Sequence, residues 1–262
     1  MPITIATWNI NSVRLRQDLV AGFLEAEAPD VLCLQETKSP VDKIPAERFE
    51  ALGYRHLVAR GEKGYNGVAI LARVPIEPAG HHDFCAKGDA RHVAARLPGG
   101  AVVHNFYVPA GGDEPDRNRN AKFAHKLDFV AEMAEWGGAD GHAAILVGDL
   151  NIAPGEHDVW SHTQMLKVVS HTPAETEALD HALSAGGWSD VVRGQIPPPE
   201  KLFSWWSYRA KDWALSDRGR RLDHIWSRGV EPVAGSARIL RPWRGRDKPS
   251  DHVPVLASFD LG

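Results

Sequence analysis

The sequence predicts a single α/β domain in which strands and helices pack in layers. Short β-branched segments alternate along the chain with segments of helical periodicity. At 262 residues, the chain is long enough for one large domain or two small ones. Polar loops at 110–120, 194–201 and 241–250 do not resemble domain linkers, because the motifs described below lie on both sides of each loop. One domain covering residues 1–262 is therefore expected.

Seven short segments with many β-branched residues are predicted to be mostly buried strands. They lie at residues 3–7, 31–35, 67–71, 93–97, 102–108, 143–147 and 255–259. Two apolar repeats of helical spacing predict helices, one after the first strand and one before the strand at 143–147. Their apolar positions are Leu15, Leu19 and Phe23 in the first, and Phe123, Leu127, Val130, Ala131 and Ala134 in the second.

A third helix is predicted from its two ends. Residues 172–175 read Thr-Pro-Ala-Glu, which is a capping box with proline at the first helical position. Two glycines at 186–187 should end this helix.

The composition is that of a globular protein and excludes a disordered chain, with 43% hydrophobic and 24% charged residues. No apolar run approaches the roughly 20 residues that span a bilayer, and the N-terminus lacks the basic region of a secretory signal. Cys33 in a strand-like segment and Cys85 in a loop offer neither a disulfide framework nor a zinc spacing. A reducing, cytoplasmic setting without a membrane is therefore expected.

The charge distribution is more informative than the net charge of -4. Between Arg209 and Lys248 there are 11 Lys and Arg against 5 Asp and Glu, a local charge of +6, so the rest of the chain carries -10. A basic segment on an acidic protein is compatible with a phosphate-rich partner and a clustered acidic metal site. Solvated charges on loops would give the same composition.

Five polar motifs, each joined to a β-like apolar segment, indicate one metal-dependent active site. They carry Asn, Asp, Glu or His and are spread from residue 9 to residue 252. The motifs are Trp8-Asn9-Ile10-Asn11, Leu34-Gln35-Glu36-Thr37-Lys38, Gly148-Asp149-Leu150-Asn151, Arg221-Leu222-Asp223-His224 and Ser250-Asp251-His252.

Glu36 is the first candidate for a metal ligand. It follows a strand that should be buried, so its carboxylate is held rigidly at a strand end. Hard cations such as Mg²⁺ prefer one or two carboxylates together with water and phosphate oxygens. A surface salt bridge with Lys38 is the alternative reading.

Asp149 and Asn151 lie two residues apart after an apolar strand that ends in Gly148. Residues i and i+2 of an extended segment point the same way, and glycine lets another backbone approach closely. A carboxylate beside a neutral amide suits water activation and phosphate orientation. An Asx-turn is the alternative.

His252 stands out among the 13 histidines of the chain because Asp251 precedes it in a loop that enters a strand. Asp223 could orient this histidine by accepting from its ring N–H. Tyr107, at the end of a strand, could donate a hydrogen bond to a phosphate oxygen or simply pack.

Tryptophans are interleaved with arginines between residues 203 and 221. Trp205, Trp206 and Trp213 could hold a sugar or base face while neighbouring Lys and Arg residues meet phosphates. These cations are Arg209, Lys211, Arg218, Arg220 and Arg221. At least one of the tryptophans is expected to be core.

In this order, the motifs resemble those of the exonuclease III family of abasic-site endonucleases. That family is part of the endonuclease/exonuclease/phosphatase superfamily, which also holds deoxyribonuclease I. The resemblance runs from Trp8-Asn9 to Asp251-His252 and so covers essentially the whole chain. The segments most particular to the exonuclease III branch are 105–109, 122–127, 205–209 and 220–223.

The resemblance implies a four-layered α/β sandwich, with two mixed β-sheets flanked by helices and the site at one edge between the sheets. It implies Mg²⁺ as the cofactor, with Mn²⁺ as a possible substitute. Glu36 would be the main ligand, and the other residues placed at the metal are Asn9, Asn11, Asp149, Asn151, Asp251 and His252. Asp149 would activate water, with Asn151, Tyr107, His252 and Asp223 as further catalytic residues.

The implied partner is double-stranded DNA with abasic sites or blocked 3′ ends. Arg91 would contact a DNA phosphate, and Trp205 and Leu222 would wall the pocket for an abasic sugar; Trp213 and Arg220 complete the expected DNA contacts. The implied activities are cleavage 5′ to abasic sites, 3′→5′ exonuclease action and 3′-end cleaning in base-excision repair. A monomer is the default expectation.

The chain departs from the family at two places. Ala110-Gly111-Gly112 stands where many members carry Asn-Gly, and Ser207 stands where Asp is common. Three other functions remain open: a superfamily hydrolase of inositol phosphates or sphingomyelin, a nonspecific deoxyribonuclease, and a DNA-binding relative without catalysis. Segments 122–126 and 205–223 argue against the first, and the presence of every expected catalytic side chain argues against the third.

Overall fold

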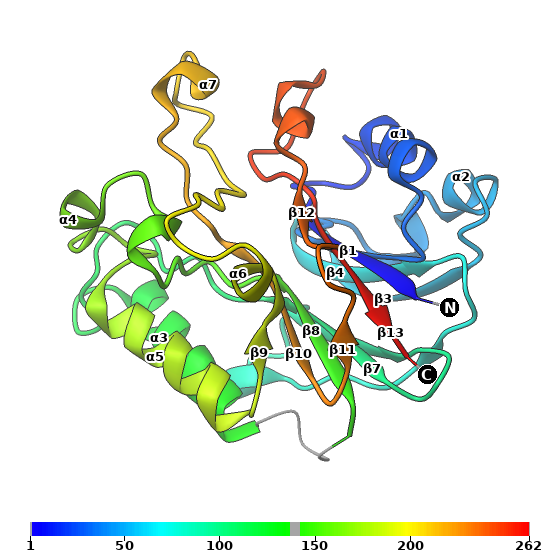
Figure 1. The fold of residues 1–262 in the computed structure, drawn as a ribbon, viewed down its shortest axis with the longest axis horizontal. Helices are drawn as coiled ribbons and strands as arrows, with labels where there is room; N and C mark the ends of the chain where they lie inside the picture. The colour runs from blue at the N-terminus through cyan, green and yellow to red at the C-terminus, as the bar shows by residue number, and fades with distance from the viewer. Residues whose placement is uncertain (1, 137–141, 262) are drawn as a thin grey trace.

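The computed structural model describes residues 2–136 and 142–261 and has two β-sheets packed face to face, with helices on both outer faces (Figure 1). This confirms the expected four-layered α/β sandwich. Each sheet contains one parallel strand pair and is otherwise antiparallel, so both sheets are mixed. The N- and C-terminal strands pair with each other, which brings the two chain ends together.

The first sheet has the strand order β11-β13-β1-β2-β4-β3, and β12 pairs with β13 beside it. Its parallel pair is β1 with β2. The strands are β1 (Ile3–Asn9), β2 (Val31–Gln35), β3 (His56–Glu62), β4 (Tyr65–Ala72), β11 (Glu231–Pro232), β12 (Arg238–Ile239) and β13 (Val255–Asp260).

The second sheet has the strand order β5-β6-β7-β8-β10-β9, with β7 and β8 as its parallel pair. The strands are β5 (Glu77–Pro78), β6 (His92–Arg96), β7 (Val102–Tyr107), β8 (Ala144–Asp149), β9 (Ser189–Asp190) and β10 (Asp223–Arg228).

Helices cover the outer face of each sheet (Figure 1). The α-helices are α1 (Gln17–Glu27), α2 (Ala46–Glu50), α3 (Ala121–Trp136), α4 (His162–Met165), α5 (Pro173–Ala185), α6 (Val191–Gln195) and α7 (Trp213–Ser216). Short 3₁₀ helices are η1 (Val41–Lys43), η2 (Phe84–Ala86), η3 (Glu156–Asp158) and η4 (Arg241–Gly245). Helices α1 and α2 pack on the first sheet, and α3 and α5 on the second.

The central strands are apolar on both faces because both faces are buried. In β2, Val31 and Cys33 point into the core between the sheets, while Leu32 and Leu34 point to the layer beneath α1. Full burial of each such side chain contributes about 1.5–3 kcal/mol before the entropy cost of folding. These layers fix the strand ends rigidly.

All seven predicted strands are present, with ends shifted by a few residues, but β3, β10 and the two-residue strands β5, β9, β11 and β12 were missed. The side chains of β3 are half-buried at a sheet edge, so their apolar alternation is weak. The polar start of β10 at Asp223-His224 looked like a loop. Leu15 is 62% exposed and lies outside α1, so the prediction that it starts the apolar face of that helix was wrong.

The capping box of α5 is confirmed. The Thr172 side chain accepts from the Glu175 amide, the Glu175 carboxylate accepts from the Thr172 amide, and the helix ends at Ala185 with Gly186 as its C-cap. No helix in the described part of the chain is long and apolar enough to cross a membrane.

Strand directions bring the polar motifs to one edge of the sandwich. The parallel pairs place Asn9 beside Gln35 and Tyr107 beside Asp149. Since β10 runs antiparallel to β8, Asp223 begins where Asp149 ends. Strand β13 likewise starts at this edge, next to the segment that carries His252. The structure therefore brings these motifs together at the edge between the sheets where the resemblance implies the site.

Candidate active site

The Glu36 carboxylate lies at the end of β2 and is held by three neighbours. Asn9 Nδ2 and Tyr107 Oη donate to Glu36 Oε1 at 3.0 and 2.8 Å, and Lys38 Nζ lies 2.7 Å from Oε2. Burial alone would raise the pKa of Glu36, but the Lys38 charge and these hydrogen bonds hold it below its ordinary value. The side chain is therefore an anion ready to bind a cation. Because it donates to Glu36, the Tyr107 hydroxyl points toward this carboxylate.

The Lys38 ammonium marks a cation-binding position. Its Nζ lies 2.7 Å from Asn11 Oδ1 as well as from Glu36, so two oxygens from different motifs surround one positive charge. Asn11 Nδ2 in turn donates to Asp251 Oδ1 at 3.3 Å. Carboxylate and amide oxygens are the ligands that Mg²⁺ prefers. The oxygens of Glu36, Asn11 and Asp251 therefore fit a hard divalent cation in place of the ammonium. The surface salt bridge that was the alternative reading of Glu36 is also present.

Backbone strain accompanies this arrangement. Asn11, Glu36 and Asn151 have φ values of 48°, 48° and 54°, in the left-handed region that non-glycine residues seldom adopt. Such conformations cost free energy and cluster at functional sites. The prediction that Asp149 and Asn151 share one face of an extended segment was wrong in its geometry, because the chain turns at Asn151.

The turn still brings Asn151 onto Asp149. Asn151 Nδ2 and Asn9 Nδ2 donate to Asp149 Oδ2 at 3.1 and 2.8 Å, and the Asn151 amide donates to Oδ1 at 3.0 Å. Burial raises the pKa of Asp149 to about 7, against the opposing charge of His252. Gly148 is required just before it: a Cβ at this residue would lie 2.0 Å from the Phe106 carbonyl oxygen. Asp149 is therefore a rigidly held carboxylate with a raised proton affinity.

His252 is oriented as the sequence predicted. Its Nδ1 lies 2.8 Å from Asp223 Oδ2, and its Nε2 lies 3.7 Å from Asp149 Oδ2. Burial disfavours the charged ring, but the carboxylates of Asp223 and Asp149 outweigh it and raise the pKa of His252 to about 10. The ring is therefore an imidazolium at neutral pH, with Nε2 facing the site.

Asp149, Asp223 and His252 also offer three ligand atoms within 4.8 Å of one another. A charged imidazolium has no lone pair for a metal, so metal binding by this trio would require His252 to lose its proton. Metal binding by the oxygens around Glu36 would require no such loss of a proton from His252. We therefore favour the Glu36 side for a cation, and a metal-ligand role for His252 stays a prediction.

A cavity of about 640 Å³ opens beside these groups. Trp205 and Leu222 line it as expected, and the Trp205 indole N–H donates to Asp251 Oδ2 at 3.0 Å. Other lining residues were missed from the sequence because they come from the segment after β8: Trp160, Met165, Val168 and Ser170. The cavity thus has a wall that combines apolar side chains with Arg209, Arg218 and Arg220. One edge is made by Glu36, Asn151, Asp251 and His252.

The other DNA contacts expected from the sequence have mixed outcomes. Arg220 lines the cavity. Arg91 is buried, pairs with Asp89 and stacks 4.8 Å from the Tyr107 ring, so in this structure it supports the tyrosine; its DNA contact stays a prediction. Trp213 is not among the cavity-lining residues and packs on Trp206, which is core.

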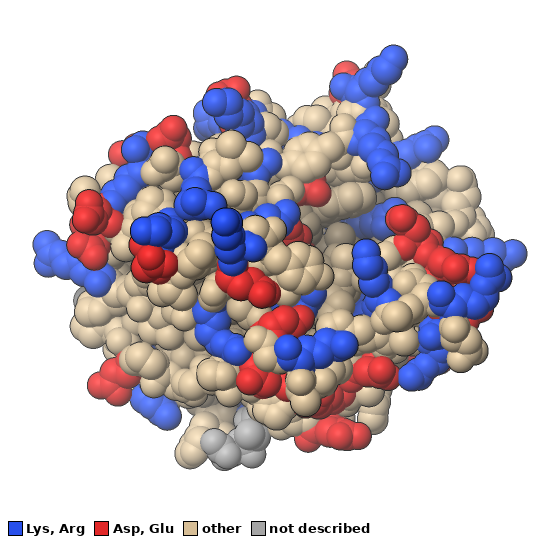
Figure 2. Space-filling model, turned by 180° about the vertical axis from the view of Figure 1, so that it is seen from behind, with Lys and Arg blue, Asp and Glu red and all other residues tan. Residues whose placement is uncertain are grey.

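Basic side chains rise from the upper edge of the molecule, where the segments carrying α7 and η4 protrude (Figures 1 and 2), and Arg241 and Arg244 of η4 stack on Trp213 of α7. Elsewhere on the face shown in Figure 2, basic and acidic side chains are intermixed. Beneath the site, a buried ion pair of Lys126 and Glu175 supports the turn, because Lys126 Nζ also donates to the Asn151 carbonyl at 2.8 Å. Only the capping role of Glu175 was predicted from the sequence.

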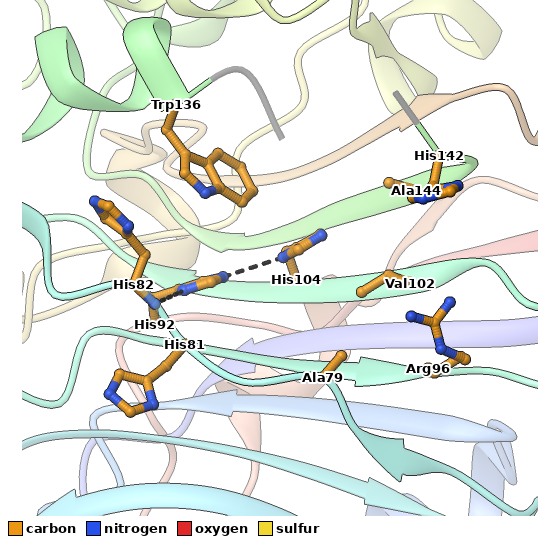
Figure 3. A pocket seen from close by; sticks show the side chains of 10 residues that line it. All are labelled: Ala79, His81, His82, His92, Arg96, Val102, His104, Trp136, His142 and Ala144. Carbon is orange, nitrogen blue, oxygen red and sulfur yellow. Dashed lines mark hydrogen bonds between the residues drawn. The ribbon is translucent and has the colours of Figure 1, made fainter. Parts of the chain in front are cut away.

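A second cavity, of about 180 Å³, lies between β5–β8 and the end of α3 (Figure 3). Five histidines line it: His81, His82, His92, His104 and His142. The His82 amide donates to His92 Nδ1 at 2.9 Å, which leaves the His92 proton on Nε2, 3.2 Å from His104 Nδ1. These two nitrogens therefore share a hydrogen bond and are not arranged as metal ligands. Burial lowers the pKa of His104 to about 4, so this ring is neutral.

The comparisons with known proteins agree with this geometry. The profile of the Endonuclease/Exonuclease/phosphatase family matches residues 6–252. Exodeoxyribonuclease III of Haemophilus influenzae is 30% identical over 275 residues, which cover 97% of this chain and 98% of that protein.

Two solved structures are similar over nearly their whole length. An AP endonuclease from Archaeoglobus fulgidus has a TM-score of 0.88 and 32% identity, covering 98% of this chain and 99% of its own. The 3′ phosphatase NExo from Neisseria, bound to a product DNA hairpin, has a TM-score of 0.86 and 30% identity, covering 98% of this chain and 99% of its own. This chain therefore belongs to the Endonuclease/Exonuclease/phosphatase family and, within it, to the exonuclease III group of DNA-hydrolysing enzymes.

Proposed function

We propose that this chain is a Mg²⁺-dependent phosphodiester hydrolase of base-excision repair that cleaves DNA 5′ to abasic sites and removes blocking groups from 3′ ends. The observation that carries the proposal is the placement of Asp149. Its carboxylate lies 3.7 Å from the charged His252 ring and shares Asn9 with Glu36, and both His252 and Glu36 line the cavity.

Asp149 is the residue that positions and deprotonates water. Two amides and a backbone N–H fix its oxygens, and its pKa of about 7 matches the working pH of a general base. The water oxygen bonds to phosphorus, the bond from phosphorus to the 3′ oxygen breaks, and that oxygen takes up a proton. The products are a 3′-hydroxyl and a 5′ phosphate.

His252 stabilises the negative charge that develops on the phosphoryl oxygens. Its proton on Nε2 faces the site because Asp223 holds Nδ1. A fixed, charged donor in a buried site is worth much more than the same donor in water. The Tyr107 hydroxyl donates to Glu36 and can turn to a phosphate oxygen.

The divalent cation is assigned to the oxygens of Glu36, Asn11 and Asp251, with Asn9 and Asp149 close by. Lys38 holds a positive charge at this position, which supports a cation site without specifying the metal. A bound Mg²⁺ supplies positive charge to the phosphoryl oxygens and lowers the barrier to hydrolysis. Mn²⁺ is the expected substitute, because both ions accept oxygen ligands.

Substrate selection is assigned to the cavity walled by Trp205 and Leu222. A sugar without a base can turn into such a pocket, and an intact nucleotide cannot do so easily. The Archaeoglobus structure is described as an AP endonuclease and the Neisseria one as a 3′ phosphatase, so both kinds of substrate are represented among similar proteins. We further propose that the protein acts as a cytoplasmic monomer.

The test uses a labelled duplex with one central abasic-site analogue and a matched undamaged duplex. Each is incubated with the purified protein in Mg²⁺ or in EDTA. The proposal predicts one cut, 5′ to the analogue, that requires Mg²⁺ and leaves a 3′-hydroxyl. Gradual shortening of both duplexes would show that the protein also has exonuclease activity.

Two results would contradict the proposal. Hydrolysis of an inositol phosphate or sphingomyelin, with both duplexes intact, would agree with the proposed catalytic residues but would show that DNA is not the substrate. Random cutting of the undamaged duplex at the same rate as the abasic one would make the protein a nonspecific deoxyribonuclease.

A further inference from the structure

Arg220 is a half-buried arginine in the wall of the active-site cavity that has no carboxylate partner among residues 2–136 and 142–261. Its Nη1 donates to the Val169 carbonyl at 3.1 Å and to Ser170 Oγ at 2.9 Å. Its Nε is buried without a hydrogen-bond partner. The Nη2 group makes no hydrogen bond to any described residue, so the guanidinium keeps donors free for a ligand.

The neighbouring Arg221 is also buried, but it has carboxylate partners. Its guanidinium contacts the carboxylates of both Asp158 and Asp190. Burial would lower the pKa of Arg221, but these carboxylates outweigh it and raise the pKa, whereas burial lowers the pKa of Arg220. Glu175 is the carboxylate whose charge acts on the pKa of Arg220, but it is already paired with Lys126. Arg220 is thus a cation whose counter-ion is missing from the described part of the protein.

An uncompensated charge in a partly buried wall costs free energy, and the fold does not remove that cost. The guanidinium is also held in place: its carbon lies 4.9 Å from the centre of the Trp205 ring, and Nη1 is anchored to the chain near residue 170. With Nη1 engaged and Nε buried, the Nη2 group of this fixed guanidinium is the donor left for a carboxylate or phosphate, and such a charge-assisted hydrogen bond is stronger than a neutral one.

The position of Arg220 relative to the reacting phosphate is set by the backbone. Trp205 forms antiparallel bridges with Arg220 on one side and with His252 on the other. Two strand spacings separate the backbones of Arg220 and His252 by about 9–10 Å. Both side chains line the same cavity. A short group attached to a phosphorus atom at His252 can therefore reach Arg220.

We propose that Arg220 is a specificity-determining residue that favours 3′ blocking groups with a second anionic group over neutral ones. The inference rests on the proposed function, because it assigns a substrate preference to the same site. The substrate class is a 3′ phosphodiester that carries a short carboxylate, such as a 3′-phosphoglycolate end. Water adds to phosphorus, the bond to the 3′ oxygen breaks, and a 3′-hydroxyl and phosphoglycolate are released.

The test compares two duplexes that differ only in the charge of the blocking group. One has a recessed 3′-phosphoglycolate end, and the other has the neutral 2-hydroxyethyl phosphate ester at the same place. Values of kcat/KM are measured for the wild type, Arg220→Gln and Arg220→Lys. Arg96→Gln, an exposed arginine on β6 outside the active-site cavity, is the matched control.

A charge-assisted hydrogen bond predicts that the wild type prefers the glycolate end by about 10- to 100-fold. The preference should fall to within about threefold in Arg220→Gln, remain partly in Arg220→Lys and stay unchanged in Arg96→Gln. Equal losses on both duplexes in Arg220→Gln, or an unchanged preference, would overturn the inference. Failure of the wild type to cut either end would overturn the proposed function and this inference with it, a result distinct from equal cutting of both.

Discussion

Two histidines in this protein differ in charge at neutral pH. His252 lies at the catalytic edge, where Asp223 and Asp149 raise its pKa to about 10. His104 lies in the histidine-lined cavity, where burial and the charge of Arg228 lower its pKa to about 4. At neutral pH the first ring is therefore an imidazolium and the second is neutral.

The difference lies in the partners, because burial acts to lower the pKa of both rings. The neighbour of His252 is a carboxylate at 2.8 Å, and the neighbour of His104 is another imidazole at 3.2 Å. Burial alone removes charge from a histidine, and a buried carboxylate restores it. A cluster of histidines is therefore not by itself a reactive site, whereas one histidine between two aspartates is.

The largest expected effect follows from replacing the carboxylate that His252 faces. Asp149→Asn keeps the shape and removes the base, so the rate of cleavage at an abasic analogue should fall by about 10²–10⁴. Single-turnover kinetics with enzyme in excess measure the loss. Binding of the uncut duplex, followed by fluorescence anisotropy, serves as the control and should change by no more than a few-fold. A variant that keeps a tenth of the wild-type rate would exclude Asp149 as the base.

The second-largest effect is expected from replacing Asp223, the carboxylate that raises the pKa of His252. Asp223→Asn can still accept from Nδ1 but carries no charge, so the pKa of His252 should fall and the rate should drop by about 10- to 100-fold. If the imidazolium is the active form, activity is present below the pKa of His252 and is lost above it. The alkaline loss of activity should therefore move to lower pH in the variant. A reduced rate with an unshifted pH profile would contradict this role.

A smaller effect concerns the cation position at Glu36. Lys38→Met removes the ammonium that lies between Glu36 and Asn11, so a divalent cation no longer has to displace it. Because the pair is partly exposed, its contribution is modest and Mn²⁺ should bind about threefold to tenfold more tightly. Titration calorimetry without DNA measures this affinity, with Lys43→Met, whose lysine is exposed on η1, as the control. Weaker Mn²⁺ binding in Lys38→Met would show that the metal lies elsewhere.

The smallest effect is on stability at the neutral histidine. In the unfolded chain His104 has a pKa of about 6.5, so between that value and about 4 the unfolded chain binds more protons and stability falls as the pH falls. His104→Gln removes this titration. From pH 7 to pH 5 its free energy of unfolding should therefore fall by up to about 2 kcal/mol less than that of the wild type. Urea unfolding at the two pH values gives the comparison, and the exposed His81→Gln should behave as the wild type does. An identical loss in His104→Gln would contradict the neutral state.

The sequence predicted the catalytic edge well, because each motif follows or precedes a recognisable strand. The ends of two parallel pairs and two antiparallel neighbours meet at that edge, so Glu36, Asp149 and His252 could be placed together before the structure was known. The hydrogen bond between Asp223 and His252 was predicted from residue chemistry alone. The alternation of strands and helices predicted a layered α/β domain, whereas the division into two sheets and four layers came from the resemblance.

Other features depend on contacts between distant segments and could not be predicted. The left-handed turn at Asn151 is supported from below by Lys126, which is 25 residues away along the sequence. The anchoring of Arg220 at Ser170 and the position of Trp213 outside the cavity depend on how loops fold over one another. Composition and spacing carry no information about such contacts.

The most direct test of the central claim, that carboxylates and not burial set the charge at the catalytic edge, is an NMR titration of the histidine rings in metal-free protein. Histidine is labelled with ¹⁵N, and the two rings are assigned with His252→Gln and His104→Gln. We predict that His252 remains an imidazolium at pH 8 while His104 remains neutral at pH 6. A neutral His252 ring at pH 8 would contradict the account, since the site would then lack the charged donor that faces Asp149.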